Sequence, residues 1–189
     1  MILNQNVDFS SLPLEHQNAF IQRSGAGPTK DLIPQGTRLY KFNGDTNLSF
    51  NDRVTGKPAM SQWWSPYDEY KHDAGWGQKL SMSRHFGVSI REYGRVTSAV
   101  KENWNSLEYL LEITLNVPVY GFFGGFASMS RIDVYEDKET GKKTVAQSRK
   151  MAGEGSGGGR LPGGATQFYI PNLTPDLVQS WNITSLANM

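Results

Sequence analysis

The sequence predicts an α+β fold, a single compact domain with a mostly antiparallel, twisted β-sheet flanked by helices. Short strand-like runs are separated by Gly, Pro and Asn turns, one strong helix signal lies mid-chain, and no internal repeat is present. With 189 residues, 38% of them hydrophobic and 12% aromatic, the chain can bury a substantial core. We expect a helical lead-in over residues 1–33 and the main α+β domain over residues 34–189.

The lead-in and the first strand follow from local signals. Ser11 can cap a helix that has Pro13 in its first turn. After the turn Pro34-Gln35-Gly36, residues 37–42 read as a strand. Alternation gives this strand two faces, with Arg38, Tyr40 and Phe42 on one and Thr37, Leu39 and Lys41 on the other. Either cation can therefore face a cleft, but not both from the same face.

The middle of the chain carries a tryptophan pair and a capped helix. Trp63 and Trp64 lie in a strand-like segment, so they should face opposite ways. Pro66, with the acidic residues that follow it, predicts the first turn of a short helix. The capping box of Ser89 and Glu92 opens a longer helix, whose apolar stripe runs to residue 104.

The second half reads mainly as strands. We expect a hydrophobic strand over 107–120, a hairpin over 131–147 with a charged tip, and a final strand over 166–170. The Gly-rich stretch 151–160 predicts mobility. Thr174 and Pro175 form a helix-start signal, which predicts a short terminal helix.

Composition and motifs exclude several classes of function. A formal net charge of +1 argues against a nucleic-acid footprint, and no apolar run or signal sequence predicts a membrane segment. Cysteine is absent, and the histidines His16, His72 and His85 are too dispersed for a metal site, so we expect no metal. Neither a Walker loop, a Rossmann fingerprint nor a Gly-x-Ser-x-Gly elbow is present.

The remaining chemistry suits a dinucleotide such as NAD. A cation can pair with the pyrophosphate, aromatic rings can sandwich a flat base, and a hydroxyl and an amide can fix its orientation. The candidate residues are Arg38 or Lys41, Ser61, Trp63 or Trp64, Phe126 and Gln167. Gln167 stands where the loop Pro162-Gly163-Gly164 becomes a strand, so a rigid element would hold its amide.

Several segments resemble the bacterial ADP-ribosyltransferase toxin superfamily. They are Leu39-Tyr40-Lys41, Ser61-Gln62-Trp63-Trp64 and the late strand with Gln167. The chain is most similar to NAD glycohydrolase toxins of the tuberculosis necrotizing toxin type, over roughly residues 34–170. That similarity is carried by Gly36-Thr37 with Lys41-Phe42, by Leu115–Gly121 with Phe126, and by Pro162–Phe168.

The resemblance implies a split sheet and assigns roles to the candidates. Gln167 matches the catalytic-site glutamine of the family, and Ser61 is compatible with the serine that begins the second strand of many transferases. Lys41 stands where the family has an arginine that holds the NAD phosphates, and a lysine lacks the bidentate fork. Arg38 or Arg84 would then take over that role. The NAD-binding set expected from the resemblance is Arg38, Tyr40, Lys41, Trp63, Arg84 and Phe126.

The same resemblance favours hydrolysis of NAD, or of NADP, over transfer. Protein-directed transferases place a glutamate on the late strand, where this chain has Gln167-Phe168-Tyr169. Such a hydrolase would be a delivered effector that depletes NAD in the target-cell cytoplasm, with NAD as substrate and no separate cofactor. Its producer would need an immunity protein. Two alternatives stay open: a protein-directed ADP-ribosyltransferase that uses Glu112 or Glu154, and a non-enzymatic module that binds glycans or proteins.

Overall fold

A seven-stranded antiparallel sheet organises the chain. The computed structural model describes residues 1–22, 27–101, 105–130, 134–136, 143–145, 160–187 and 189. The strand order is β1 (Thr29–Ile33), β7 (Val119–Gly125), β12 (Thr166–Tyr169), β5 (Trp63–Pro66), β2 (Arg38–Asn43), β6 (Tyr109–Leu115) and β13 (Val178–Ser185). Every neighbouring pair in this order is antiparallel. The expected α+β class with a mostly antiparallel sheet is confirmed.

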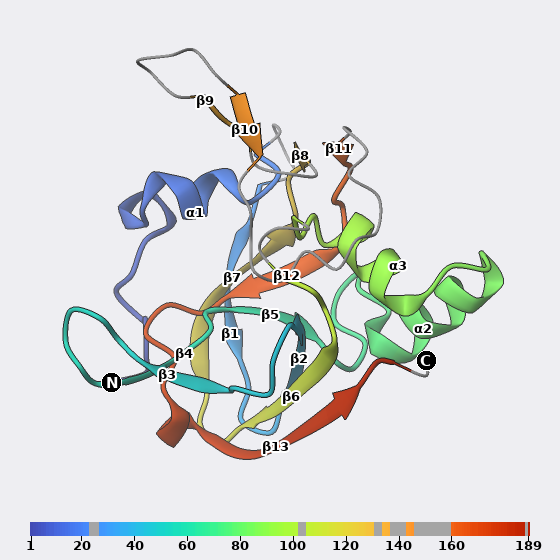
Figure 1. Ribbon diagram of the computed structural model, residues 1–189. Coiled ribbons are helices and arrows are strands. Elements are labelled where there is room, and N and C mark those ends of the chain that lie inside the picture. The colour runs from blue at the N-terminus through green and yellow to red at the C-terminus, as the bar shows by residue number, and fades with distance from the viewer. Residues whose placement is uncertain (23–26, 102–104, 131–133, 137–142, 146–159, 188) are drawn as a thin grey trace.

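Short helices lie against this sheet. They are α1 (Leu14–Asn18), α2 (Gly75–His85) and α3 (Ile90–Thr97), with 3₁₀ turns at Phe9–Ser11 and Pro175–Leu177. Figure 1 shows α2 and α3 together on one flank of the sheet and α1 on the opposite flank. None of the helices in the described ranges has the length and apolar character that a membrane crossing requires.

Three two-stranded ribbons complete the structure. They pair β3 (Ser49–Asn51) with β4 (Pro58–Met60), β8 (Met129–Ser130) with β11 (Arg160–Leu161), and β9 (Val134–Glu136) with β10 (Lys143–Val145). The β9–β10 pair confirms the expected hairpin, whose charged tip over 137–142 lies outside the described residues. Most of the Gly-rich stretch 151–160 lies outside them as well.

The two faces of β2 pack into separate cores, as its alternation predicts. Leu39 is buried in the main cluster with Trp64 and Ile113. Tyr40 packs on the other face against Trp76 of α2 and Ile90 of α3. A residue of β2 therefore belongs either to the side of α2 and α3 or to the opposite side. Lys41 shares the side of Leu39.

Strand β5 is the point at which the sheet divides. Trp63 and Trp64 pair with Tyr169 and Phe168 of β12, whereas the second half of β5, Ser65-Pro66, pairs with β2. Its two neighbours thus use different halves of one short strand, and they separate beyond these pairs. Lys41 on β2 and Gln167 on β12 each adjoin the last paired position. This divergence leaves room for the cavity described below.

Several expected elements differ in the structure. Part of the expected helical lead-in is strand β1, which pairs with β7, and α1 begins at Leu14 after Pro13, so Ser11 is not its N-cap. The hydrophobic strand expected over 107–120 is two strands, β6 and β7, separated at Asn116–Pro118. Helix α3 is capped by Ser89 as predicted but ends at Thr97. Soon after that end, Ala99 has φ 50°, a left-handed conformation that stops a helix.

Two expectations about helices were wrong. The turn after Pro66 does not begin a helix: the chain makes a Tyr70–Asp73 bridge first, and α2 starts at Gly75. The terminal helix predicted at Thr174 is a single 3₁₀ turn followed by the long strand β13. The β-branched and aromatic residues of β13 pair with β6 along its length, so sheet pairing overrides the local helix-start signal.

Candidate functional site

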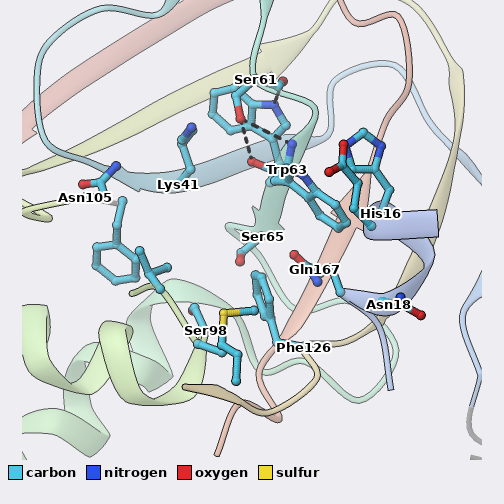
Figure 2. Close-up of a pocket in the computed structure, with 17 residues that line it drawn as sticks. His16, Asn18, Lys41, Ser61, Trp63, Ser65, Ser98, Asn105, Phe126 and Gln167 are labelled. Atoms are coloured by element: carbon cyan, nitrogen blue, oxygen red, sulfur yellow. Dashed lines mark hydrogen bonds and ion pairs between the residues drawn. The ribbon is translucent and has the colours of Figure 1, made fainter. Parts of the chain in front are cut away.

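A cavity of about 510 Å³ opens where β2 and β12 separate. Six of the predicted candidates line it: Lys41, Ser61, Trp63, Trp64, Phe126 and Gln167. They come from β2, the approach to β5, β5 itself, the end of β7 and β12. Figure 2 shows Gln167 pointing into the middle of this space, between Trp63 and Phe126, with Lys41 on the far wall. The volume falls within the range of small-molecule sites.

Gln167 is the most unusual group in the cavity. Its side chain is 0% exposed, and neither Nε2 nor Oε1 has a hydrogen-bond partner among the residues that the structure describes. Ser106 and Asn116 each have one buried atom in that state, whereas Gln167 has both of its polar atoms unpaired. An unsatisfied buried polar group costs about 1–3 kcal/mol, so a native structure retains one where something else provides the partner.

Lys41 places a desolvated cation in the same cavity. Its Nζ lies 5.9 Å from the centre of the Trp64 ring. Burial lowers the pKa of Lys41 to about 8, and the nearby Asp45 carboxylate partly offsets that effect. A lysine in this environment remains largely charged at neutral pH and gains most from an anionic ligand, since such a ligand restores the interactions lost with water.

Aromatic rings form one wall. The half-buried Trp63 ring packs 4.5 Å from the ring of Tyr169 and 5.4 Å from that of Phe20, measured between ring centres. Phe126 is also half-buried, and its backbone N–H donates to the carbonyl of Ala165 at 2.8 Å. The wall is therefore fixed by packing and offers apolar surface to a flat ring.

Ser61 lies at the entrance to β5. Its Oγ is 3.4 Å from both the backbone N and the backbone O of Trp63, which are long contacts for a hydroxyl. Its carbonyl accepts the indole N–H of Trp64 at 2.7 Å. The hydroxyl is thus weakly engaged and available to a ligand.

His16 also lines the cavity, and sequence reasoning considered it only as a metal ligand. Its Nδ1 is 2.7 Å from the hydroxyl of Tyr169, and its Nε2 is 3.7 Å from a carboxylate oxygen of Glu15. Burial raises the pKa of Tyr169 to about 12, and Glu15 acts in the same direction, so the phenol stays protonated at neutral pH. The pair is 153 residues apart in sequence, so no local pattern could have revealed it.

Three predicted residues lie outside this cavity. Arg38 is exposed, pairs with the carboxylate of Asp68 and stacks over the Tyr67 ring at 4.4 Å. Tyr40 is 1% exposed and buried beneath α2 and α3. Arg84 is exposed near the end of α2. Arg38 and Tyr40 differ from Lys41 because strand alternation directs them to the other face.

The carboxylates considered as alternatives also lie elsewhere. Glu112 is half-buried on β6 and does not line the cavity; burial raises its pKa, and a hydrogen bond with Asn182 opposes that shift. Glu154 is outside the described residues. Glu15, in contrast, lines the rim with its side chain 81% exposed. Across the described ranges, no three His, Asp or Glu side chains form a group that could hold a metal ion.

No protein-family model, curated protein or solved structure matches the chain. The function must therefore be argued from this cavity and from the chemistry of the residues that line it.

Proposed function

We propose that the chain is an NAD glycohydrolase, a toxin or effector that cleaves the nicotinamide–ribose bond of NAD. The observation that carries the proposal is the buried amide of Gln167, which has no described protein partner and points into the cavity. A ribose hydroxyl or an attacking water offers the donor and acceptor that this amide lacks. The desolvated Lys41 supports the proposal because it suits the pyrophosphate of the same substrate.

The reaction requires one bond to break and one to form. As the C1′–N1 bond breaks, its electron pair leaves with nicotinamide, and positive charge develops on the ribose. A water oxygen then bonds to C1′ and releases a proton, so the products are nicotinamide, ADP-ribose and H⁺. Gln167 would orient the ribose or the water, Lys41 would fix the pyrophosphate, and Trp63 and Phe126 would hold the nicotinamide ring.

The test measures loss of NAD and release of nicotinamide by the purified chain beside Gln167→Ala. We expect rapid cleavage by the wild type and a loss of about 100-fold or more in the variant, since a single positioned polar group contributes that much. Gln78→Ala is the matched control, because Gln78 is exposed on α2 and does not line the cavity. Intact NAD after incubation with the wild type would overturn the proposal.

A toxin of this kind should also act on the cells that express it. Expression in a cell without an inhibitor protein should deplete NAD and stop growth, and Gln167→Ala should relieve both effects. The producer would then need a cognate immunity protein that occludes the cavity or its mouth. Normal growth and normal NAD in cells that express the active wild-type chain would argue against a toxic role.

Transfer of ADP-ribose to a protein is the second candidate, and one observation favours it. Glu15 places an exposed carboxylate at the rim of the cavity, where an acceptor side chain would approach. Hydrolysis ranks first because the group deep in the cavity is an amide and not a carboxylate. The two reactions separate in one assay: hydrolysis yields free ADP-ribose equal to the nicotinamide released, whereas transfer leaves labelled ADP-ribose on protein.

A further inference from the structure

A second hollow, of about 630 Å³, adjoins the first. The two share His16, Lys41, Ser61 and Trp63, so they meet along one boundary and Lys41 lies on it. The lining of the second hollow is different in character, because it has asparagine side chains, a carboxylate and an exposed phenylalanine in place of Trp64 and Phe126. A ligand that spans both hollows would present its middle to Lys41.

Phe50 provides the aromatic surface of the second hollow. It lies on β3, at the centre of the short β3–β4 ribbon, and is 56% exposed. An exposed ring in the wall of a hollow is a stacking platform for a purine, and such stacking is typically worth about 1–3 kcal/mol for each base.

Asp45 provides an anchored carboxylate. Its Oδ1 accepts the side-chain amide of Asn43 at 2.8 Å and the backbone N–H of Asn47 at 2.9 Å. These bonds fix the carboxylate in the wall of the hollow, next to Lys41, whose charge it supports. A fixed carboxylate accepts hydrogen bonds from the 2′- and 3′-hydroxyls of a ribose, and it repels a 2′-phosphate.

We propose that the second hollow binds the adenosine half of the dinucleotide, and that Asp45 makes the site selective for NAD over NADP. This inference rests on the proposed function, which assigns the nicotinamide half to the hollow that contains Gln167. Phe50 stacks on the adenine, Asp45 binds the adenosine ribose, and Lys41 pairs with the pyrophosphate between the two halves. The selected substrate class is therefore a dinucleotide without a 2′-phosphate.

The test compares ADP-ribose with 2′-phospho-ADP-ribose by calorimetry on the full chain, and NAD with NADP as substrates. We expect the wild type to bind ADP-ribose at least about tenfold more tightly than the 2′-phosphorylated form. In Asp45→Asn the ratio should fall to within about threefold. The asparagine keeps an Oδ1 acceptor for Asn43 and Asn47, so the turn is retained.

Phe50→Ala gives the second arm. This variant should bind both ligands about tenfold more weakly and leave the ratio of the two affinities unchanged, since both ligands contain the adenine. Phe86→Ala and Glu69→Gln are the matched controls: both residues are exposed and line neither hollow, and their variants should bind like the wild type.

The outcomes separate this inference from the proposed function. If NAD is cleaved while Asp45→Asn keeps the wild-type ratio and Phe50→Ala keeps wild-type affinity, the adenosine subsite is overturned and the glycohydrolase stands. If ADP-ribose binds with the expected ratio but NAD stays intact, the subsite stands and the glycohydrolase falls. Equal binding of the two ligands by the wild type overturns the selectivity directly.

Discussion

Thr166 and Gln167 are neighbours on β12, yet their polar groups are in opposite states. The hydroxyl of Thr166 donates to the buried carboxylate of Asp73, which also accepts Lys79 at 2.7 Å and the backbone N–H of Gly75 at 2.8 Å. Gln167 faces the other way and finds no partner among the described residues. Adjacent residues of one strand thus differ: the hydroxyl of Thr166 is paired by the protein, and the amide of Gln167 is not paired by the described residues.

The two partly buried lysines show the same contrast. Burial lowers the pKa of both, but Asp73 pairs directly with Lys79 and opposes that shift. For Lys41 the opposing Asp45 is weaker, and the pKa falls to about 8. Lys41 and Gln167, which are both desolvated and lack the direct pairing that Asp73 gives to Lys79 and Thr166, line one cavity. Such a grouping is typical of a functional site.

The largest effect should come from Gln167→Met, which replaces the unpaired amide with an apolar side chain of similar size. We expect cleavage of NAD to fall by about 100-fold or more. The free energy of unfolding should stay unchanged or rise by about 1 kcal/mol, because the variant removes a desolvated polar group. Denaturant unfolding and the NAD assay on the same preparations check both parts. A large loss of stability would show that the amide has a structural partner.

Asp73→Ala tests the hydrogen bonds that the Asp73 carboxylate makes with Thr166, Lys79 and Gly75. Removing this carboxylate leaves Lys79 buried without its partner, so unfolding should become easier by about 3 kcal/mol. Denaturant unfolding measures the change, and Glu69→Ala, at an exposed carboxylate, should stay within about 0.5 kcal/mol of the wild type. An Asp73→Ala chain as stable as the wild type would mean that this network does not stabilise the fold.

The charge of Lys41 should make kcat/KM for NAD depend on pH, with a smaller effect than the loss of Gln167. Since the lysine loses its charge as pH rises through about 8, kcat/KM for NAD should fall across that pH by about tenfold. In Lys41→Arg the profile should stay flat up to about pH 10, because arginine keeps its charge. If kcat/KM of the wild type is also independent of pH, Lys41 does not bind the substrate.

The free energy of unfolding should rise with pH, whereas kcat/KM for NAD should fall. The pKa of Lys41 is lower in the folded chain than the ordinary lysine value of 10.5. Folding is therefore less favourable at pH values where Lys41 is charged in both the folded and the unfolded chain. That penalty is complete below about pH 8 and is gone by about pH 10.5. Relative to Lys41→Met, the free energy of unfolding of the wild type should therefore rise across this window, as measured by denaturant titration at fixed pH values.

The smallest effect should come from Arg38→Ala. Arg38 and Asp68 are both exposed, and such pairs contribute about 0–1 kcal/mol. NAD cleavage should change by less than about twofold, since Arg38 lines neither hollow. A strong loss of NAD affinity would assign the pyrophosphate to Arg38 and not to Lys41.

Local signals in the sequence predicted the elements that local interactions determine. Ser89 does cap α3, because its hydroxyl accepts the backbone N–H of Glu92, and alternation along β2 does separate Lys41 from Arg38. Pairing between distant segments decided the rest. Strand β13 overrides the helix-start signal at Thr174, and α2 begins without a side-chain cap hydrogen bond, so its start could not be read from sequence.

The candidate site could be predicted only in part, for the same reason. Gln167 stood out because a Gly turn runs directly into its strand, and Lys41 because of its place on β2. The contact between His16 and Tyr169 spans 153 residues, and the hollow beside Asp45 is lined by segments as far apart as His16 and Leu111. Neither has a local sequence signal.

The ¹H–¹⁵N signal of the Gln167 side-chain amide, assigned by its absence in Gln167→Met, reports directly whether this amide binds the ligand. The probe is carba-NAD, whose nicotinamide–ribose linkage resists hydrolysis, added to the wild-type chain until binding saturates. We expect a large shift of this amide pair, since the ligand supplies the partner that the described protein groups do not. A Gln167 signal that stays in place while the ligand binds, or a chain that does not bind carba-NAD, would contradict it.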